Sequence, residues 1–446
     1  MVDLMMNEQR SSTAGKDVPA GYKLTEVGVI PEDWDCVPFG NLFKTNTKKK
    51  KVSDYELVSF IGMQDVSEDA QLKNNTQLPF KEVKSGFTYF EKGDVLLAKI
   101  TPCFENGKGC HTADLPTNVG FGSTEFHVLR ENEDSDSRFI YFWTTDKKFR
   151  ASLESEMVGS AGHRRVPLVA IEKYLIPCPP NLQEQSAIAD SLSDINNFIL
   201  ALEKLIVKKQ AIKTATMQQL LTGKTRLPQF ALRKDGSAKG YKKSELGAIP
   251  EDWVVTSIGQ FTDCCAGGTP STKISAYWGG THPWMSSGEL HLKQVYAVAD
   301  YITDEGLVNS STKYVPKNSV LVGLAGQGKT RGTVAINRIE LCTNQSIAAI
   351  FPSKHHSTEF LFYNLDSRYE ELRSLSTGDG GRGGLNLTII RKLHLAFPPK
   401  EEQAAIAAIL SDMDKEIQIL QQRLDKTRQL KQGMMQELLT GKIRLI

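Results

Sequence analysis

The chain of 446 residues is long enough for about three domains of ordinary size. Hydrophobic residues make up 40% and charged residues 24% of it, and 54 Lys and Arg against 52 Asp and Glu leave a formal net charge of +2. This balance is typical of a globular protein and neither requires nor excludes a nucleic-acid partner. The richest apolar stretch, residues 198–207, contains Glu203 and Lys204 and falls short of the ~20 residues of a membrane helix. We therefore expect no membrane association, and no secretory signal is recognisable at the start.

The cysteines indicate a reducing, cytoplasmic location. There are seven, irregularly spaced and without a Cys-x-x-Cys pair. Cys103, Cys110 and His111 come nearest to a metal-binding cluster, but they lack a fourth ligand and the usual spacing. The sequence predicts free thiols and no metal site.

The chain is internally duplicated. Residues 21–34 read GYKLTEVGVIPEDW and residues 240–253 read GYKKSELGAIPEDW, with ten of 14 positions identical. MQQLLTGK at 217–224 recurs as MQELLTGK at 435–442, and a double proline, at 179–180 and 398–399, precedes each long helical segment. The period is far longer than the ~20–50 residues of a solenoid repeat. The pattern predicts a duplicated unit of one domain and one long helix.

The blocks between each IPEDW motif and the following double proline have diverged. Residues 35–178 and 254–397 are equal in length but share little sequence. Each is predicted to be mixed α/β, with a strand-like run (residues 94–98 and 319–323) and one or two helices (residues 137–155 and 357–374). Two divergent heads in a repeated frame indicate that each head meets a different part of one target.

The two long helices carry an apolar seam. Its residues are spaced alternately four and three apart in both helices, which is typical of a coiled coil. At ~1.5 Å per residue, the 39 residues from Gln183 to Leu221 would span roughly 58 Å. We expect the two helices to pair antiparallel within the chain; an intermolecular coiled coil is the alternative. The predicted seam consists of Ile188, Leu192, Ile195, Ile199, Leu202, Ile206, Ile406, Leu410, Met413, Ile417, Leu420 and Leu424.

Residues 323–330 (GLAGQGKT) match the phosphate-loop pattern. That motif works only when a helix follows the loop, because the helix N-terminus faces the phosphates. Here residues 331–336 read as a second strand. Nucleotide hydrolysis is therefore a minor alternative, and a basic glycine-rich loop between strands can equally contact a DNA phosphate.

Further candidate contacts are basic or aromatic. Arg382 lies in a glycine-rich loop, and Arg164 and Arg165 occupy the corresponding place in the first block. Lys48–Lys51 reads either as a solvated loop or as a phosphate contact. Trp278 and Trp284 lie in a segment interpreted as turn-rich, where stacking or groove contact is one possibility. No catalytic motif or cluster was found, and the sequence predicts no catalytic residue.

These features resemble the specificity subunits of type I restriction–modification systems. The resemblance rests on the duplicated IPEDW motifs and LTGK-ended helices, on residues 268–271 (GTPS), 277–280 (YWGG) and 284–288 (WMSSG), and on residues 96–108 and 343–346 (TNQS). It implies two target-recognition domains, each reading half of a bipartite DNA site, and a coiled coil that fixes the gap. It also implies modification subunits that use S-adenosylmethionine to methylate adenine and restriction subunits that use ATP. This chain would itself bind no cofactor and catalyse nothing.

The organisation expected on this basis has six segments. They are a flexible N-terminus (1–20), recognition domain 1 (21–180), a central helix (181–224), a linker (225–239), recognition domain 2 (240–399) and a C-terminal helix (400–446). The expected partners are double-stranded DNA, two modification subunits that dock on the coiled coil and the start motifs, and restriction subunits. A coiled-coil scaffold without DNA binding is the alternative from another class. The predicted DNA contacts are Lys99, Asn106, Lys108, Arg164, Arg165, Thr269, Ser271, Lys273, Ser286, Ser287, Lys329, Arg331 and Arg382.

Overall fold

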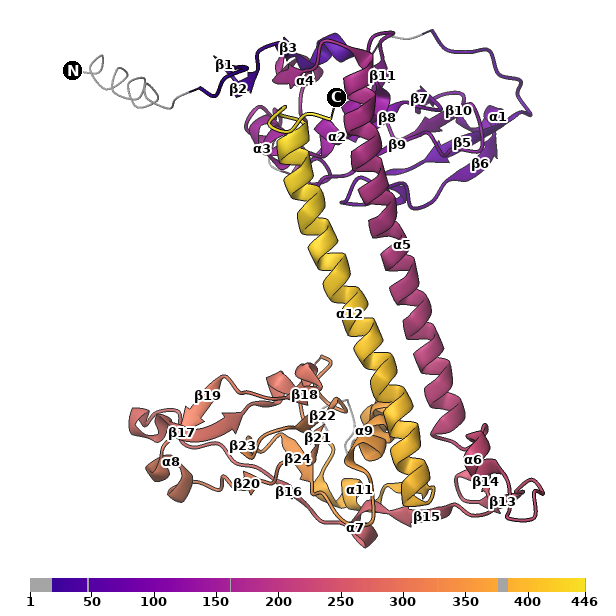
Figure 1. The fold of residues 1–446 in the computed structure, drawn as a ribbon, viewed down its shortest axis with the longest axis vertical. Coiled ribbons are helices and arrows are strands. Elements are labelled where there is room, and N and C mark those ends of the chain that lie inside the picture. The colour runs from indigo at the N-terminus through magenta and orange to yellow at the C-terminus, as the bar shows by residue number, and fades with distance from the viewer. Residues whose placement is uncertain (1–17, 46–47, 161, 327, 376–383, 446) are drawn as a thin grey trace. The chain divides into compact units, whose positions relative to one another are not determined.

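The computed structural model describes residues 18–45, 48–160, 162–326, 328–375 and 384–445. Contacts between residues divide the chain into two units. Unit 1 comprises the chain up to Glu203 together with the segment from Arg423 onward, and unit 2 comprises Lys204–Gln422. Each unit thus contains one globular head and part of each long helix (Figure 1). We call residues 18–181 head 1 and residues 221–399 head 2.

The two long helices are α5 (Leu182–Leu220) and α12 (Lys400–Leu438). Each follows a double proline. Because proline lacks the backbone N–H that a helix interior requires, each helix begins only after the pair. At the start of α5 the side chain of Asn181 accepts a hydrogen bond from the Glu184 N–H at 2.8 Å. Each helix is followed by a glycine with a positive φ of 70°, Gly223 or Gly441, so the Thr-Gly pairs end the helices as predicted.

The helices pair antiparallel, as predicted. In unit 1 the Lys431 ammonium donates to Asn196 Oδ1 at 2.6 Å and Arg428 pairs with Glu203 at 2.6 Å. In unit 2 Lys209 pairs with Glu416 at 2.7 Å. Positions that rise along α5 therefore meet positions that fall along α12, within one chain. All twelve predicted seam residues are buried or half-buried.

The seam has a second role that the spacing did not reveal. Ile188 and Leu192, at the start of α5, belong to the core of head 1, and Ile406 and Leu410, at the start of α12, belong to the core of head 2. The opposite helix ends enter the same two cores through Met435 to Leu439 and Met217 to Leu221. The seam thus joins the helices to the heads as well as to each other.

Head 1 is built on two four-stranded sheets with strand orders β6-β5-β10-β7 and β4-β11-β8-β9, and the pairs β1-β2 and β12-β3 lie outside them. Its strands are β1 (Tyr22–Thr25), β2 (Gly28–Pro31), β3 (Asp35–Pro38), β4 (Phe43–Lys44), β5 (Leu57–Ile61), β6 (Thr76–Pro79), β7 (Thr88–Glu91), β8 (Val95–Ala98), β9 (Gly109–His111), β10 (Val119–Gly122), β11 (Phe126–Glu131) and β12 (Leu175–Cys178). Its helices are η1 (Phe39–Leu42), η2 (Met63–Asp65), α1 (Phe80–Val83), α2 (Ser137–Thr145), α3 (Lys147–Ser155) and α4 (Leu168–Lys173).

Head 2 has a five-stranded sheet, β16-β24-β21-β22-β18, a four-stranded sheet, β19-β17-β23-β20, and the pairs β13-β14 and β15-β25. Its strands are β13 (Tyr241–Ser244), β14 (Gly247–Pro250), β15 (Val254–Ser257), β16 (Cys264–Ala266), β17 (Trp278–Met285), β18 (Gln294–Val295), β19 (Asp300–Ile302), β20 (Tyr314–Val315), β21 (Val320–Gly323), β22 (Val334–Asn337), β23 (Leu341–Thr343), β24 (Ile347–Ile350) and β25 (His394–Phe397). Its helices are α6 (Pro228–Ala231), α7 (Ile258–Phe261), η3 (Ser275–Tyr277), η4 (Ser287–Leu292), α8 (Asp304–Val308), α9 (Thr358–Asp366), α10 (Tyr369–Ser374) and α11 (Leu387–Lys392).

The mixed α/β class is confirmed, and each expected helical region consists of two helices. The region 137–155 forms two helices, because Asp146 leaves the helical conformation and accepts hydrogen bonds from the N–H groups of Lys148 and Phe149. The region 357–374 is likewise split between α9 and α10. Trp278 to Met285 is a strand and not the turn-rich segment that we expected.

Three general features bear on function. All seven cysteines are free thiols, and burial raises the pKa of Cys110 and of Cys178 to about 12. Within the described ranges no three His, Cys, Asp or Glu side chains gather closely enough to hold a metal ion. Among the residues that the structure describes, none of the helices combines the length and apolar character needed to cross a membrane.

Candidate nucleic-acid interface

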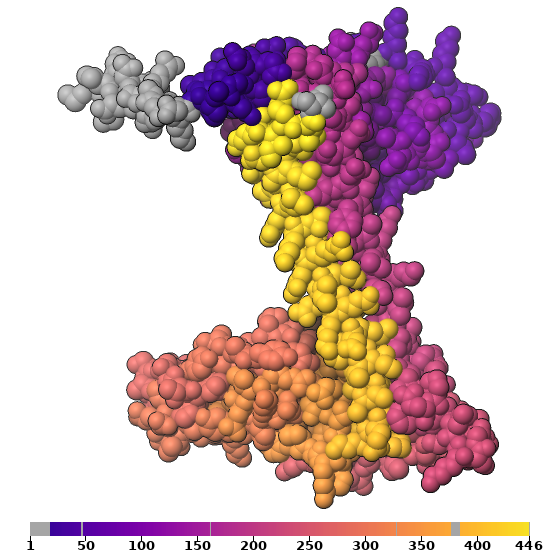
Figure 2. Space-filling view, viewed as in Figure 1, coloured from indigo at the N-terminus to yellow at the C-terminus, as the bar shows by residue number. Residues whose placement is uncertain are grey.

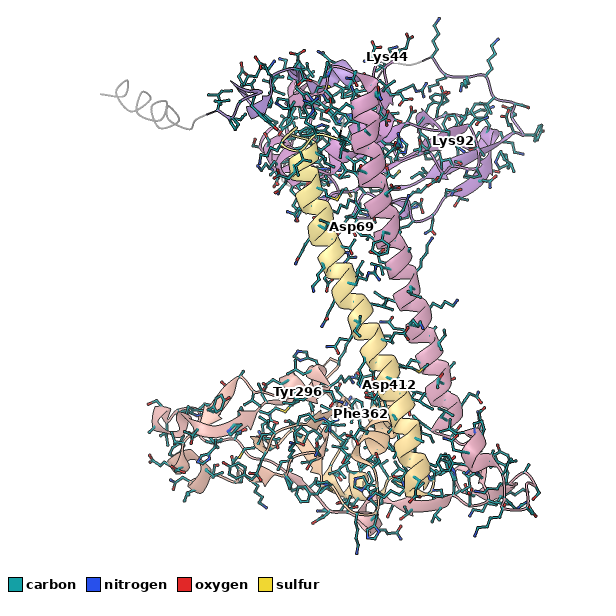
Figure 3. All side chains as sticks on the ribbon, viewed as in Figure 1. Lys44, Asp69, Lys92, Tyr296, Phe362 and Asp412 are labelled. Atoms are coloured by element: carbon teal, nitrogen blue, oxygen red, sulfur yellow. The ribbon has the colours of Figure 1, made fainter. Side chains whose placement is uncertain are left out.

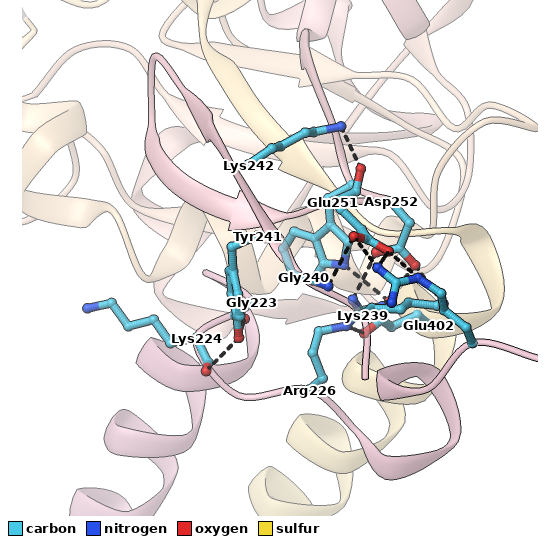
Figure 4. Close-up of polar contacts among 12 residues, drawn as sticks. Gly223, Lys224, Arg226, Lys239, Gly240, Tyr241, Lys242, Glu251, Asp252 and Glu402 are labelled. Atoms are coloured by element: carbon cyan, nitrogen blue, oxygen red, sulfur yellow. Dashed lines mark hydrogen bonds and ion pairs between the residues drawn. The ribbon is translucent and has the colours of Figure 1, made fainter. Parts of the chain in front are cut away.

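The duplicated motifs meet at a buried ionic junction, seen for unit 2 in Figure 4. Glu402, in the first turn of α12, is fully buried and accepts a hydrogen bond from Trp253 Nε1 at 3.2 Å. Arg226, just beyond the end of α5, donates to both carboxylate oxygens of Glu402 at 2.7 Å and also to Asp252. Burial raises the pKa of Asp252, but hydrogen bonds from Arg226 and Lys239 outweigh that effect and lower the pKa to about 2.

The glycine of the LTGK motif fits beneath the same tryptophan. Tyr241 Oη donates to the carbonyl oxygens of Gly223 and Lys224, both at 3.1 Å. A Cβ on Gly223 would lie 2.6 Å from Pro250 and 3.2 Å from the Trp253 ring. The IPEDW and LTGK motifs are therefore two halves of one junction that fixes a helix end to a head.

Unit 1 contains the same junction, made from the other copies of the motifs. Trp34 Nε1 donates to Glu184 Oε2 at 3.2 Å, and Arg444 donates to both Glu184 and Asp33. Tyr22 Oη lies 3.2 Å from the Lys442 carbonyl oxygen that accepts its hydrogen bond. The space-filling view shows the last turns of α12, in yellow, packed against head 1 (Figure 2). Every charge in these junctions has a partner, which suits a structural role.

Head 2 places polar residues where two parallel strands end together. β17 and β23 are parallel, with Trp284 opposite Cys342 and Met285 opposite Thr343. Ser286 and Ser287 follow β17, and Asn344 and Gln345 follow β23. The Asn344 N–H donates to the Met285 carbonyl at 3.1 Å, which holds the two strand ends side by side. We call this the strand-end edge of head 2.

The GTPS loop joins the same edge. The Gly268 N–H donates to the Thr343 carbonyl at 2.8 Å, and Thr269 Oγ1 donates to Gln345 Oε1 at 2.6 Å. Trp284 Nε1 donates to the Gly268 carbonyl at 3.0 Å. A Cβ on Gly267 would lie 1.9 Å from the Thr343 oxygen, so only glycine permits this approach. Three motifs that are far apart in the sequence thus form one surface.

Comparison with known proteins identifies the family. The family model described as "Type I restriction modification DNA specificity domain" matches residues 31–214 and again residues 250–429. The chain belongs to this family. The MjaVIII specificity subunit of Methanocaldococcus jannaschii is 25% identical over 426 residues, which cover 93% of this chain and 94% of that one.

Three other likenesses are partial or structural. The EcoEI specificity subunit of Escherichia coli is 36% identical over 168 residues, 37% of this chain and 28% of that protein, so the matched stretch spans less than a third of this relative. The S subunit of a type I restriction–modification system from M. genitalium has the same fold, with a TM-score of 0.57, 14% identity and coverage of 94% and 98% of the two chains. A chain from a structure of a type I restriction–modification system gives a TM-score of 0.55 at 15% identity. Members of this family are non-catalytic specificity subunits, and this chain carries two recognition domains.

Three of the predicted contacts in head 1 come together, although Lys99 is distant in sequence from Arg164 and Arg165. Ile100 and Arg165 form a β-bridge, the Thr101 N–H donates to the Arg164 carbonyl, and the Val166 N–H donates to the Lys99 carbonyl, both at 2.9 Å. Lys99, Arg164 and Arg165 therefore lie on neighbouring backbone segments.

Carboxylates orient several of these side chains. Arg165 forms a two-point pair with Glu125 at 2.8 and 2.9 Å, and the Arg164 guanidinium lies 3.5 Å from Glu105. Asn106 donates to Glu68 Oε1 at 3.1 Å, and the Lys108 ammonium donates to the Met63 carbonyl at 3.0 Å. Lys108 is thus partly engaged in holding the loop at Met63.

In head 2 the structure contradicts the phosphate-loop interpretation. The loop at residues 324–333 joins β21 to β22, which are antiparallel, and no helix follows it among the described residues. Lys329 is exposed on this hairpin. Trp278 Nε1 donates to the Ser271 carbonyl, so both tryptophans brace the GTPS loop; Trp284 is buried and Trp278 is half-buried. Lys273 is exposed on that loop, and Arg382 lies outside the described residues.

The run Lys48–Lys51 is exposed, and Lys50 pairs with Glu91 at 2.5 Å.

The strand-end edge of head 1 is formed by Gln64, Ser123 and Thr124, which no sequence motif marks. There β5 and β10 are parallel, with Ile61 opposite Gly122. The available signal was turn-forming residues directly after two short apolar strands, but nothing in the sequence paired those two strands.

Proposed function

We propose that each recognition domain reads one half of a bipartite, gapped DNA target and that the paired helices set the spacing. The observation that carries this is the duplicated junction, which fixes each head to a helix end through the same residues while the exposed edges differ. A repeated rigid frame with two different reading surfaces suits a target with two different halves. In this proposal the recognition domains span residues 21–180 and 240–399.

The proposed DNA contacts fall into two chemical classes. Lysine and arginine side chains contact phosphates or guanine, and hydroxyl and amide side chains contact phosphates or adenine. The orienting carboxylates beside Arg164 and Arg165 support a role in which the guanidinium groups are held in fixed directions. The full set remains Lys99, Asn106, Lys108, Arg164, Arg165, Thr269, Ser271, Lys273, Ser286, Ser287, Lys329, Arg331 and Arg382.

The helices offer surfaces for the proposed modification subunits. Apolar side chains stay exposed on α5 in unit 2 (Leu205, Val207 and Ile212), and Leu430 is exposed on α12 in unit 1. We propose that these exposed apolar groups contact another protein. Because the frame is duplicated, we propose two modification subunits, together with restriction subunits, in a cytoplasmic complex. S-adenosylmethionine and ATP would be bound by those chains.

A methylome tests the proposal. The specificity subunit is expressed together with its modification subunit, and modified adenines are mapped by single-molecule sequencing. We expect one gapped motif, absent when this chain is omitted. Unchanged methylation without this chain, with the modification subunit demonstrably active, would refute the specificity role. A chain that shows no salt-dependent binding to duplex DNA would instead favour a scaffold.

A further inference from the structure

The strand-end edges of the two heads are held by the same hydrogen bonds, although their sequences differ. In head 1 the Ser123 N–H donates to the Ile61 carbonyl at 3.1 Å. In head 2 the Asn344 N–H donates to the Met285 carbonyl, also at 3.1 Å. Each bond joins the first residue after the second parallel strand to the last residue of the first strand. The two edges therefore have equivalent backbones.

Three further pairs of bonds fix the register between the heads. After the first strand, a backbone N–H is bound by the carboxylate three residues later: Gly62 by Asp65 at 2.7 Å, and Ser286 by Glu289 at 2.9 Å. In the second pair, the Phe126 N–H donates to the Ser123 carbonyl in head 1 and the Ile347 N–H donates to the Asn344 carbonyl in head 2, both at 3.3 Å. In the third pair, the Lys99 N–H donates to the Glu125 carbonyl at 2.9 Å in head 1, and the Leu324 N–H donates to the Ser346 carbonyl at 2.7 Å in head 2. Residues 62–65 thus correspond to 286–289, and residues 123–125 correspond to 344–346.

With this register, each edge presents one exposed glutamine. It follows the first parallel strand in head 1 and the second parallel strand in head 2. Gln64 in head 1 corresponds to Gly288 in head 2, and Gln345 in head 2 corresponds to Thr124 in head 1. All four positions are exposed. The backbone is therefore shared, and the position of the amide is what distinguishes the two edges.

Both amides are held at one end. Gln64 Nε2 donates to Asp65 Oδ2 at 3.3 Å, and its amide covers Gly62, where a Cβ would lie 2.4 Å from Nε2. Gln345 Oε1 accepts from Thr269 at 2.6 Å. Each side chain is oriented and remains exposed, so less rotamer entropy is lost when it binds.

We propose that Gln64 and Gln345 are specificity-determining residues, each reading a base edge in the half-site of its own head. A glutamine amide pairs with adenine through the N6 and N7 groups in the major groove. The inference rests on the proposed function, and it deepens it by naming the base-reading side chain in each half.

The surroundings of each edge fit this assignment. In head 1 the Lys99 N–H bond to Glu125 brings the loop with Lys99 beside Thr124, and Arg165 is paired to the same Glu125. In head 2 the Leu324 N–H bond to Ser346 brings the hairpin that carries Lys329 beside Gln345. Cationic loops next to an exposed amide fit the general pattern of protein–DNA complexes, in which phosphate contacts position the protein and base contacts specify the sequence.

The experiment uses the full chain with its modification subunit and maps methylated motifs for Gln64→Ala and Gln345→Ala. Exposed amides away from the edges, Gln77 in head 1 and Asn309 in head 2, provide Gln77→Ala and Asn309→Ala as matched controls. We expect Gln64→Ala to relax a base position in one half of the motif and Gln345→Ala to relax a position in the other half. Discrimination at that position should fall by about tenfold or more, the size expected for one amide–adenine pair. The controls should leave the motif unchanged.

A second variant separates a lost contact from a damaged fold. A carboxylate accepts a hydrogen bond from cytosine, so Gln345→Glu should shift the preferred base in one half, which misfolding cannot imitate. An unchanged motif in both alanine variants, a uniform loss of methylation with the same motif, or relaxation of both halves by one variant would each overturn the proposal. If the unmodified chain itself directs no gapped motif, the proposed function fails first, and that outcome is distinct.

Discussion

The two helix junctions use the same residue types but differ in how far their ions are buried. Glu184 and Glu402 are both buried and both accept from a tryptophan. The side chain of Arg226 is only 7% exposed, whereas that of Arg444 is 31% exposed. Duplication has therefore kept the contacts that build the frame, while the electrostatic surroundings of each copy have diverged. The comparison predicts which substitutions should act equally in both units and which should not.

The largest and most unequal effect is expected for the buried glutamates. Glu402→Ala leaves the Trp253 N–H without its partner and leaves the buried Arg226 guanidinium with Asp252 alone, and should cost about 3–5 kcal/mol of unfolding free energy. Glu184→Ala should cost less, because the Arg444 side chain is more exposed and can turn toward water. Urea titration of the full chain measures both values. The exposed neighbour Glu401→Ala is the control, and equal losses in the two glutamate variants would contradict the comparison.

A second difference is a buried histidine that unit 1 lacks. Gln403 Oε1 accepts from the Ser357 N–H at 2.8 Å and Gln185 Oε1 accepts from the Asp136 N–H at 3.2 Å, which makes His356 the counterpart of Ser135. His356 packs edge-on against Phe261 at 5.1 Å, and among the described residues its Nε2 has no hydrogen-bond partner.

Burial lowers the pKa of His356 from 6.5 to about 4; nearby Lys400 and His355 act in the same direction and Glu359 opposes them. Below pH 6.5 the imidazole of His356 is protonated in the unfolded chain but stays neutral in the folded chain, so stability is lost as the pH falls toward 4. The loss should reach about 3 kcal/mol. Unfolding measured across this range should have a shallower pH slope in His356→Ser than in the parent. Parallel slopes in the two proteins would rule out this source of acid sensitivity.

The repeated frame was predictable because its signals are local. Glycine and proline positions, the double prolines and the 3–4 apolar spacing located both helices: α5 lies one residue before the expected Gln183–Leu221, and α12 begins at Lys400 as expected but ends at Leu438, before the expected end at 446. The junction was not predictable in detail, because Glu402 and Arg226 are 176 positions apart and no periodicity joins them.

The reading surfaces were only half predictable. GTPS, WMSSG and TNQS could be named as motifs, but their meeting depends on the parallel pairing of β17 with β23. Gln64 could not be singled out from the sequence, because its segment matches no motif. The strand before it, β5, pairs with β10, which lies some 60 positions further along the chain. Pairing between distant strands is set by the tertiary packing of both faces, which short-range patterns do not contain.

Substitution of the junction glycines should act equally in the two units. Gly223 and Gly441 both have φ of 70°, and a Cβ on either would lie 2.6 Å from a proline, Pro250 or Pro31. Gly223→Ala and Gly441→Ala should therefore each cost about 2 kcal/mol through backbone strain and overpacking. Gly433, inside α12 with open space around its Cβ position, is the matched control. Gly433→Ala should stabilise the chain by about 0.5–1 kcal/mol, so thermal unfolding should shift in opposite directions. Clearly different losses at Gly223 and Gly441 would show that the two junctions are not equivalent after all.

The smallest effect concerns a lysine at equivalent places on the helix pair. Lys213 in unit 2 pairs with Asp414, which also accepts from Tyr363 Oη at 2.7 Å. In unit 1 the equivalent of Lys213 is Lys431, 218 positions later, and the equivalent of Asp414 is Asn196, 218 positions earlier. Lys431 therefore donates to a neutral amide where Lys213 has a carboxylate. Burial lowers the pKa of Lys431, and the carboxylates of Asp69 and Glu203 oppose that effect. These two carboxylates line a cavity of about 240 Å³ beside Lys431, with Asp69 labelled in Figure 3.

Asn196→Asp should give Lys431 the ion pair that Lys213 already has. We expect the pKa of Lys431 to rise and unit 1 to gain less than about 1 kcal/mol, because Asp69 and Glu203 already supply part of the compensating charge. Asp414→Asn should produce the reverse change in unit 2. Both effects should shrink as salt is added, since the pairs are partly exposed to solvent. Unfolding at low and high ionic strength measures them, and a destabilised Asn196→Asp chain would mean that the desolvation cost of the new carboxylate exceeds its attraction to Lys431.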